Sequence, residues 1–127
     1  MLENIIENEI AYDIRTAIFM VYHNLGPGLL ESVYERALSY ELEKIGRRVK
    51  RQEGVPVIYE DIDLDLGFRL DLLVDDLVIV EIKSVDKLLG VHYKQVTTYL
   101  KLSRLRLGIL VNFNTDDIEG NIKRIIK

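Results

Sequence analysis

The sequence predicts a single α/β domain in which a mixed β-sheet carries helices on its faces. Three observations support this prediction. Apolar residues recur at helical spacing in two successive N-terminal stretches, over residues 3–23 and then up to about residue 45. Three strand-like runs follow: residues 55–60, 64–74 and 77–84. A helical stretch at residues 88–103 precedes a fourth run at 105–112, and such an intervening helix permits parallel pairing through a crossover.

The two N-terminal helices are separated by a Gly-Pro-Gly break. The apolar positions of the first helix are Ile6, Ile10, Ile14, Ala17, Ile18 and Val21. Residues 25–28, Leu-Gly-Pro-Gly, end that helix, and a proline near a first turn suits a new start. The buried arc expected for the second helix consists of Leu30, Val33, Tyr34, Ala37, Leu38 and Ile45.

The C-terminal part of the chain predicts one helix and two strands. Residues 88–103 place an apolar stripe on one helical face: Leu89, Tyr93, Val96 and Leu100. The run at 105–112 is almost continuously apolar, which is typical of a strand buried on both faces. Residues 120–127 carry three isoleucines and predict a short terminal strand.

Composition limits the classes of function. Residues 1–127 fit one domain with its own core, and no Pro/Gly/Ser linker or repeat divides them. Cysteine is absent, which excludes disulfides, thiolate zinc sites and a cysteine nucleophile. No apolar run reaches membrane-spanning length and the first residues are acidic, so we expect a cytoplasmic protein without membrane contact. The net charge of −4 argues against a protein that coats nucleic acid, although it is compatible with a local basic patch.

The hairpin at residues 67–84 carries charges among alternating apolar residues. A three-residue connection at 75–77 gives the expected pairs Leu70 with Ile82, Leu72 with Val80 and Val74 with Val78, whereas a two-residue turn would oppose apolar and charged residues. This register predicts one buried apolar face: Phe68, Leu70, Leu72, Val74, Val78, Val80 and Ile82. Arg69 and Asp71 then share the opposite face with Glu81 and Lys83, and Asp71 lies opposite Glu81.

The opposed carboxylates of Asp71 and Glu81 require compensation. Like charges opposite each other destabilise a sheet unless one is protonated or a cation lies between them. Their oxygens, with the carbonyl of Ile82, suit a hard divalent cation such as Mg²⁺. Lys83 could orient a water or neutralise charge that develops on a phosphate. The alternative is that these charges form an ordinary solvated face and that Asp71 protects a sheet edge from aggregation.

Several segments together resemble the GxxExxY family, which belongs to the PD-(D/E)XK nuclease superfamily. The resemblance rests on the run Gly28-Leu29-Leu30-Glu31-Ser32-Val33-Tyr34, on Asp71 and Glu81-Ile82-Lys83, on residues 95–99 and on the strand at 108–113. It implies a restriction-endonuclease-like fold with an α-β-β-β-α-β core, here with an extra N-terminal helix. Leu70 stands where the superfamily's name has a proline, which is not a ligand.

The resemblance also implies a phosphodiesterase site that uses Mg²⁺ or Mn²⁺. Asp71 and Glu81 would be metal ligands, and Lys83 would be the catalytic lysine. Glu31 would be a further acidic member that acts on metal or water. On spacing alone, the position of Glu31 in the first turn of a helix favours compensation of the helix dipole, whereas the family motif favours a role in the site.

A polar stripe on the helix at 88–103 is expected beside this site. By the period of about 3.6 residues, His92, Gln95 and Tyr99 lie roughly a quarter turn from the apolar stripe. Gln95 and Tyr99 match the helix pattern of the family and would position phosphate or water, whereas His92 is interpreted as an ordinary boundary residue.

A basic run lies near the predicted end of the second helix: Lys44, Arg47, Arg48, Lys50 and Arg51. It could follow nucleic-acid phosphates or form a solvated cluster that compensates the helix dipole. We expect a metal-dependent nuclease that hydrolyses phosphodiester bonds in DNA, and a homodimer would extend its surface over a duplex. The alternative is a non-catalytic module that binds nucleic acid or protein and retains the nuclease fold.

Overall fold

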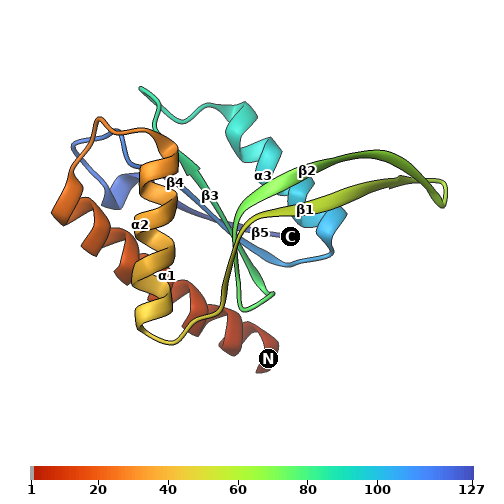
Figure 1. The fold of residues 1–127 in the computed structure, drawn as a ribbon, viewed down its shortest axis with the longest axis horizontal. Coiled ribbons are helices and arrows are strands. Elements are labelled where there is room, and N and C mark those ends of the chain that lie inside the picture. Colours follow the sequence, from red (N-terminus) through yellow and green to blue (C-terminus); the bar gives the residue numbers. More distant parts are fainter. Residues whose placement is uncertain (1) are drawn as a thin grey trace.

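The computed structural model describes residues 2–127, with side chains described from residue 5 onward. The elements are α1 (Leu2–Leu25), α2 (Glu31–Lys44), β1 (Val49–Tyr59), β2 (Ile62–Val74), β3 (Val78–Lys83), α3 (Gly90–Ser103), β4 (Leu107–Asn112), the 3₁₀ turn η1 (Glu119–Asn121) and β5 (Ile122–Ile126). This order contains the predicted α-β-β-β-α-β core, preceded by helix α1 (Figure 1). The predicted terminal strand is confirmed as β5.

The five strands form one mixed sheet in the order β1-β2-β3-β4-β5. Strands β3 and β4 are parallel, as the crossover through α3 allows, and the other neighbouring strands are antiparallel. No helix in the described part of the chain is long and apolar enough to span a membrane.

Helices cover both faces of the sheet (Figure 1). Helices α1 and α2 pack on one face, against strand residues Leu72, Val74, Val78, Val80, Ile82, Leu107, Ile109 and Val111. Helix α3 packs on the other face through Val96 and Leu100, against Leu70, Leu73, Ile79 and Leu110. Each face therefore has its own apolar core, and the α/β architecture expected from the sequence is confirmed.

The register predicted for the β2–β3 hairpin is confirmed where the strands pair. Leu72 pairs with Val80 and Val74 with Val78. Asp75 and Asp76 take left-handed conformations with φ of 52° and 58°. Leu77 lies in the connection, as the three-residue turn predicts, and its amide donates to the Val74 carbonyl at 3.0 Å. Strand β3 therefore begins at Val78, one residue after its predicted start.

The predicted faces of this hairpin are partly wrong. Phe68 and Leu70 pack with α3 and not with Leu72 on the α1 and α2 side. The β2–β3 ladder ends at Leu72, so Leu70 and Ile82 do not pair as expected. Here the Asp71 amide donates to the Glu81 carboxylate and the Ile82 amide donates to the Asp71 carboxylate, in place of ladder carbonyls. The strict alternation of side chains along the strand is therefore interrupted at Asp71.

Strand β1 begins at Val49, six residues before its predicted start at Val55. The pairing with β2 extends down to Val49 opposite Val74. Residues 50–53 are polar and show no apolar alternation, and they form a strand because they pair with β2. Lys50 and Arg51 therefore lie on a strand and not near the end of a helix. At its other end, the β1–β2 hairpin projects from the body as an arm (Figure 1).

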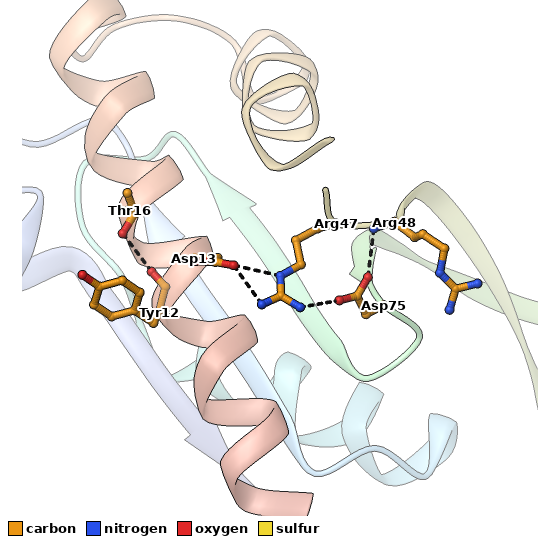
Figure 2. Close-up of polar contacts among 6 residues, drawn as sticks. All are labelled: Tyr12, Asp13, Thr16, Arg47, Arg48 and Asp75. Atoms are coloured by element: carbon orange, nitrogen blue, oxygen red, sulfur yellow. Dashed lines mark hydrogen bonds and ion pairs between the residues drawn. The ribbon is translucent and has the colours of Figure 1, made fainter. Parts of the chain in front are cut away.

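Most of the basic run is paired with acids of the same chain. Figure 2 shows Arg47 between Asp13 of α1 and Asp75 of the β2–β3 connection, with ion-pair distances of 2.8 Å to each. Hydrogen bonding to Asp75, and next to Asp13, raises the pKa of Arg47. The other ion pairs of the run are Lys44 with Glu41, Arg48 with Asp76 and Lys50 with Asp76. These pairs favour internal charge compensation over a phosphate track.

Candidate active site

The acid pair lies where β2 and β3 separate. The Asp71 backbone amide donates to Glu81 Oε1 at 3.0 Å, and the Ile82 amide donates to Asp71 Oδ2 at 2.8 Å. Each carboxylate is thus held by the backbone of the facing strand, so the two acids converge as the sequence predicted. The Glu81 side chain is only 3% exposed, which excludes the solvated-face interpretation for this residue.

Burial and like charge act together on Glu81. Burial, followed by the negative charge of Asp71, raises the pKa of Glu81 from 4.5 to about 8. Lys83 and the hydrogen bond from the Asp71 amide act in the opposite direction without cancelling this effect. The metal-free pair is therefore an electrostatically unfavourable arrangement that binding of a cation would relieve.

Helix α3 supplies two polar side chains to the acid pair. Lys83 Nζ donates a hydrogen bond to Gln95 Oε1 at 3.0 Å. The Tyr99 ring stacks on Phe68, with centroids 4.2 Å apart and planes at 6°. Burial, and next the charge of Glu81, raises the pKa of Tyr99. The structure therefore brings Lys83, Gln95 and Tyr99 together beside the acids, while His92 Nδ1 accepts from the Leu89 amide at the start of α3.

The tyrosine of the GxxExxY run fixes the loop before α2. Gly26 and Gly28 have φ of 68° and 98°, which side chains rarely adopt, so glycine suits this turn. The Tyr34 hydroxyl donates to the Gly26 carbonyl at 2.6 Å and accepts from the Leu29 amide at 3.1 Å. The Tyr34 ring also stacks on Phe113, with centroids 4.3 Å apart. The run thereby sets where helix α2 begins.

Glu31 is the first residue of α2 and points to the end of β3. Its Oε2 accepts from the Ser84 amide at 3.1 Å, and the Ser84 hydroxyl donates to the Leu29 carbonyl at 2.6 Å. Glu31 is therefore attached one residue beyond Lys83. Among the described residues, however, no group of three or more His, Cys, Asp or Glu side chains is arranged to hold a metal ion.

Two residues that the sequence analysis did not select connect α2 with the acid pair. Gln52 Nε2 donates to Glu35 Oε1 at 2.5 Å and lies 3.4 Å from Asp71 Oδ1. Glu35 is buried one helical turn after Glu31. Gln52 has a left-handed φ of 53° within strand β1. A charged residue beside the buried Tyr34 was a usable signal for Glu35, whereas nothing in the local sequence indicates this conformation of Gln52.

Asn112 is a further polar residue that the sequence analysis missed. It is 1% exposed and lies at the end of β4, opposite Lys83 on the parallel strand β3. Its Oδ1 accepts from the Val85 amide at 3.0 Å, and its Nδ2 donates to the Val85 carbonyl at 2.9 Å. Asn112 therefore fixes the chain that leaves β3 directly after the catalytic-lysine candidate.

The available donors fit a lightly ligated divalent cation. Mg²⁺ commonly keeps several waters and binds proteins through one or two carboxylates together with substrate phosphates. Asp71 and Glu81 supply two carboxylates whose backbone contacts hold them in place. Burial and the charge of Asp71 raise the pKa of Glu81, so a bound cation would favour ionisation of this pair. This donor set suits Mg²⁺ or Mn²⁺ and contains no soft ligand, since the chain has no cysteine.

A mixed sheet with two acids and a lysine on adjacent strands is an arrangement suited to hydrolysis of phosphodiesters. The family model described as the PD-(D/E)XK nuclease superfamily matches residues 8–125, so the chain belongs to this superfamily. Membership indicates nuclease activity in general, a nucleic-acid substrate and a general dependence on divalent metal. No curated protein and no solved structure matches the chain significantly.

Proposed function

We propose that the protein is a nuclease of the GxxExxY type that hydrolyses phosphodiester bonds in DNA with Mg²⁺ or Mn²⁺. The observation that carries this proposal is the buried Glu81, held against Asp71 with its pKa raised to about 8. A structural acid of this kind is costly without a cation, because both desolvation and like charge disfavour its ionisation. A divalent cation compensates both effects, and Asp71 and Glu81 are the residues that would hold it.

The bound cation would supply Lewis-acid stabilisation of the charge that develops on the phosphate. Lys83 is the catalytic lysine of this proposal. Its ammonium group donates to the phosphate or to the attacking water, while Gln95 Oε1 holds it in place from α3. The hydroxyl of Tyr99, whose pKa is raised by burial and by Glu81, donates a hydrogen bond to phosphate or water.

Glu31 has a second role in this proposal. Its carboxylate accepts from the Ser84 amide and so ties the start of α2 to the end of β3. From this position it would act on the metal or on the attacking water without forming a group of three acids around the metal. Gln52 donates to Asp71 Oδ1, and Glu35 in turn accepts from Gln52. A cytoplasmic location and a homodimer complete the proposal, the first supported by the cysteine-free composition.

A metal-dependent nicking assay on supercoiled DNA tests this function. We expect cleavage with Mg²⁺ or Mn²⁺ and none with a chelator. Asp71→Ala and Lys83→Ala should each reduce the rate by about 10²-fold or more. Asp116→Ala, which removes an exposed acid far along the chain, is the matched control and should cleave like the wild type. Equal cleavage by all four proteins would identify a contaminating nuclease and contradict the proposal.

The alternative, a non-catalytic binding module, is favoured by the ion pairs that compensate most of the basic run. A parallel panel of labelled DNA and RNA, single-stranded and duplex, separates the two functions. Binding without cleavage on every substrate, with Mg²⁺ and with Mn²⁺, would establish the module. Cleavage of RNA alone would retain the nuclease and correct its substrate.

A further inference from the structure

The arm formed by residues 57–66 takes no part in the proposed active site. Its large apolar side chains are unusually open to solvent, with exposures between 43% and 72%: Ile58, Tyr59, Ile62, Leu64 and Leu66. Figure 1 shows this hairpin projecting beyond the layers of the domain. An isolated two-stranded hairpin is at best marginally stable in water. An arm with this many exposed apolar residues therefore requires a covering surface.

The charges on the arm restrict what can cover it. The tip carries four exposed acids and no cation: Glu60, Asp61, Asp63 and Asp65. A nucleic-acid backbone would be repelled by this tip, so the substrate of the proposed nuclease is excluded as the occupant. The complementary surface must combine apolar side chains with positive charge.

A hollow with this chemistry lies at the base of the same arm. It has a volume of about 570 Å³ and lies between strand β1 and the C-terminal end of α3. Its apolar lining includes Val55, Leu73, Leu102 and Leu105. Lys101 and Arg104 also line it, and neither has an acidic ion-pair partner in the part of the chain that the structure describes.

The acids of the hollow do not cancel this charge. Asp76, one of its two acidic lining residues, already pairs with Lys50 at 2.8 Å. Glu53, the other, lies on β1 four residues before the arm and forms no ion pair with Lys101 or Arg104 in the described part of the chain. The hollow is therefore an apolar concavity with two available cations, complementary to an apolar tip with four acids.

Tip and hollow belong to the same hairpin, since strand β1 lines the hollow with residues up to Ile58 of the arm. The tip begins four residues beyond Pro56, or about 13 Å along a strand. Two copies related by a twofold axis can therefore lay their arms side by side in opposite directions, each tip over the other copy's base. Such an interface is isologous, because the same pair of surfaces is used twice. Pro56 offers no N–H at the sheet edge, so side chains and not continuous strand pairing would make the contact.

We propose that the hollow at the base of the arm binds the arm tip of a second copy of this chain, so that two copies clasp each other through their arms. Apolar tip residues fill the hollow, and Lys101 and Arg104 pair with acids of the partner's tip. This interface lies at the C-terminal end of α3, beyond Gln95 and Tyr99, and gives the homodimer proposed above a location that is independent of the nuclease chemistry. It requires neither metal nor nucleic acid.

A reciprocal charge exchange tests the clasp. The tip variant is Glu60→Lys with Asp63→Lys, and the base variant is Lys101→Glu with Arg104→Glu. All four positions are exposed, and circular dichroism and thermal melting verify that each variant remains folded. The matched control is Glu9→Lys with Asp116→Lys, which makes the same charge change as the tip variant at two exposed acids outside the arm. Sedimentation velocity measures the oligomeric state, without metal or nucleic acid.

We expect the wild type and the control to be dimers, and each exchange variant to associate about a hundredfold or more weakly. Mixing the tip and base variants should restore the dimer, because both tip-to-base contacts in the mixed pair then join opposite charges. A monomeric wild type, a base or tip variant that dimerises like the wild type, or a mixture that stays monomeric would overturn the clasp. None of these outcomes depends on the nicking assay, so failure of the clasp and failure of the nuclease are distinguishable.

Discussion

The backbone amide of Asp71 donates a 3.0 Å hydrogen bond to the carboxylate of Glu81. The side-chain carboxylate of Asp71, in contrast, repels the negative charge of Glu81. Attraction through the backbone thus holds together two side chains that repel each other. The Ile82 amide holds Asp71 in the same way. The acid pair is therefore preorganised without a cation, because its geometry is set by backbone groups and not by a metal.

Replacing Asp71 by asparagine should stabilise the metal-free protein. The asparagine side chain would keep an oxygen acceptor for the Ile82 amide while removing the charge that opposes ionisation of Glu81. Mn²⁺ at one hundred times its dissociation constant should stabilise the wild type by about 2.7 kcal/mol. At roughly 3–6 °C per kcal/mol, differential scanning fluorimetry resolves this shift. Asp116→Asn is the control and should melt like the wild type. A metal site would be contradicted if Mn²⁺ did not raise the melting temperature of the wild type and Asp71→Asn melted no higher than the wild type.

The stability of the metal-free protein should depend on pH through Glu81. Its pKa is about 8 in the folded protein and 4.5 in the reference state, so the folded state binds more protons between these values. The contribution of protonated Glu81 to the free energy of unfolding is therefore complete below about pH 4.5. It is lost as the pH rises towards 8, by at most about 1.4 kcal/mol per pH unit. Urea unfolding of the wild type and of Glu81→Gln at several pH values isolates this contribution. A difference between them that does not change with pH would contradict it.

Metal affinity should follow the opposite trend with pH. Because Glu81 must lose its proton to bind a cation, the Mn²⁺ affinity should rise up to about pH 8, by at most about tenfold per unit. Isothermal titration calorimetry in buffers of different ionisation enthalpy should detect the released proton. Binding that is independent of pH over this range would show that Glu81 is not a ligand.

Gln52→Ala should weaken the binding of Mn²⁺ by about tenfold, as loss of residues that orient a ligand commonly does. The change removes the donor between Glu35 and Asp71 and leaves a buried carboxylate unpaired. Glu35→Gln, which keeps an oxygen acceptor for Gln52, should have a smaller effect. Glu43→Gln removes the same charge from an exposed position of α2 and should bind Mn²⁺ like the wild type. Unchanged affinity in Gln52→Ala would show that Gln52 does not orient Asp71.

Arg47→Met should destabilise the fold by about 1–3 kcal/mol, because it leaves Asp13 and Asp75 without their shared cation (Figure 2). Arg48→Met is the matched control. The Arg48 side chain is 79% exposed and lies 3.5 Å from Asp76, so we expect a change within about 0.5 kcal/mol. Chemical denaturation of both variants measures the difference. Equal free energies of unfolding for the two variants would show that the ion pairs of Arg47 do not stabilise the fold.

The register of the β2–β3 hairpin was predictable because a three-residue connection places apolar residues opposite apolar ones and Asp71 opposite Glu81, whereas a two-residue turn would oppose apolar and charged residues. The faces of Phe68 and Leu70 were not predictable in the same way. Both faces of the sheet are covered by helices, so an apolar residue is buried on either side and its identity does not reveal which. Apolar alternation determines a face only where the opposite face meets water.

The acids and the lysine of the candidate site were predictable because they lie within one hairpin and interrupt an apolar pattern. The contacts of Glu31 with Ser84, and of Glu35 with Gln52, join residues distant in the sequence. No local pattern encodes such pairs. The start of β1 at Val49 was not predictable for the same reason, since the polar residues after Val49 form a strand only by pairing with β2.

The arm proposed to clasp a second copy lies apart from the acid pair of Asp71 and Glu81, and protein engineering can use this separation. Its turn at Glu60 and Asp61 carries none of the proposed active-site residues, and exposed loop tips tolerate inserted sequence. A fluorescent domain inserted between these two residues would leave the hairpin of Asp71 and Glu81 unaltered. Such a chimera would report on the environment of the tip while the acid pair remains available to metal.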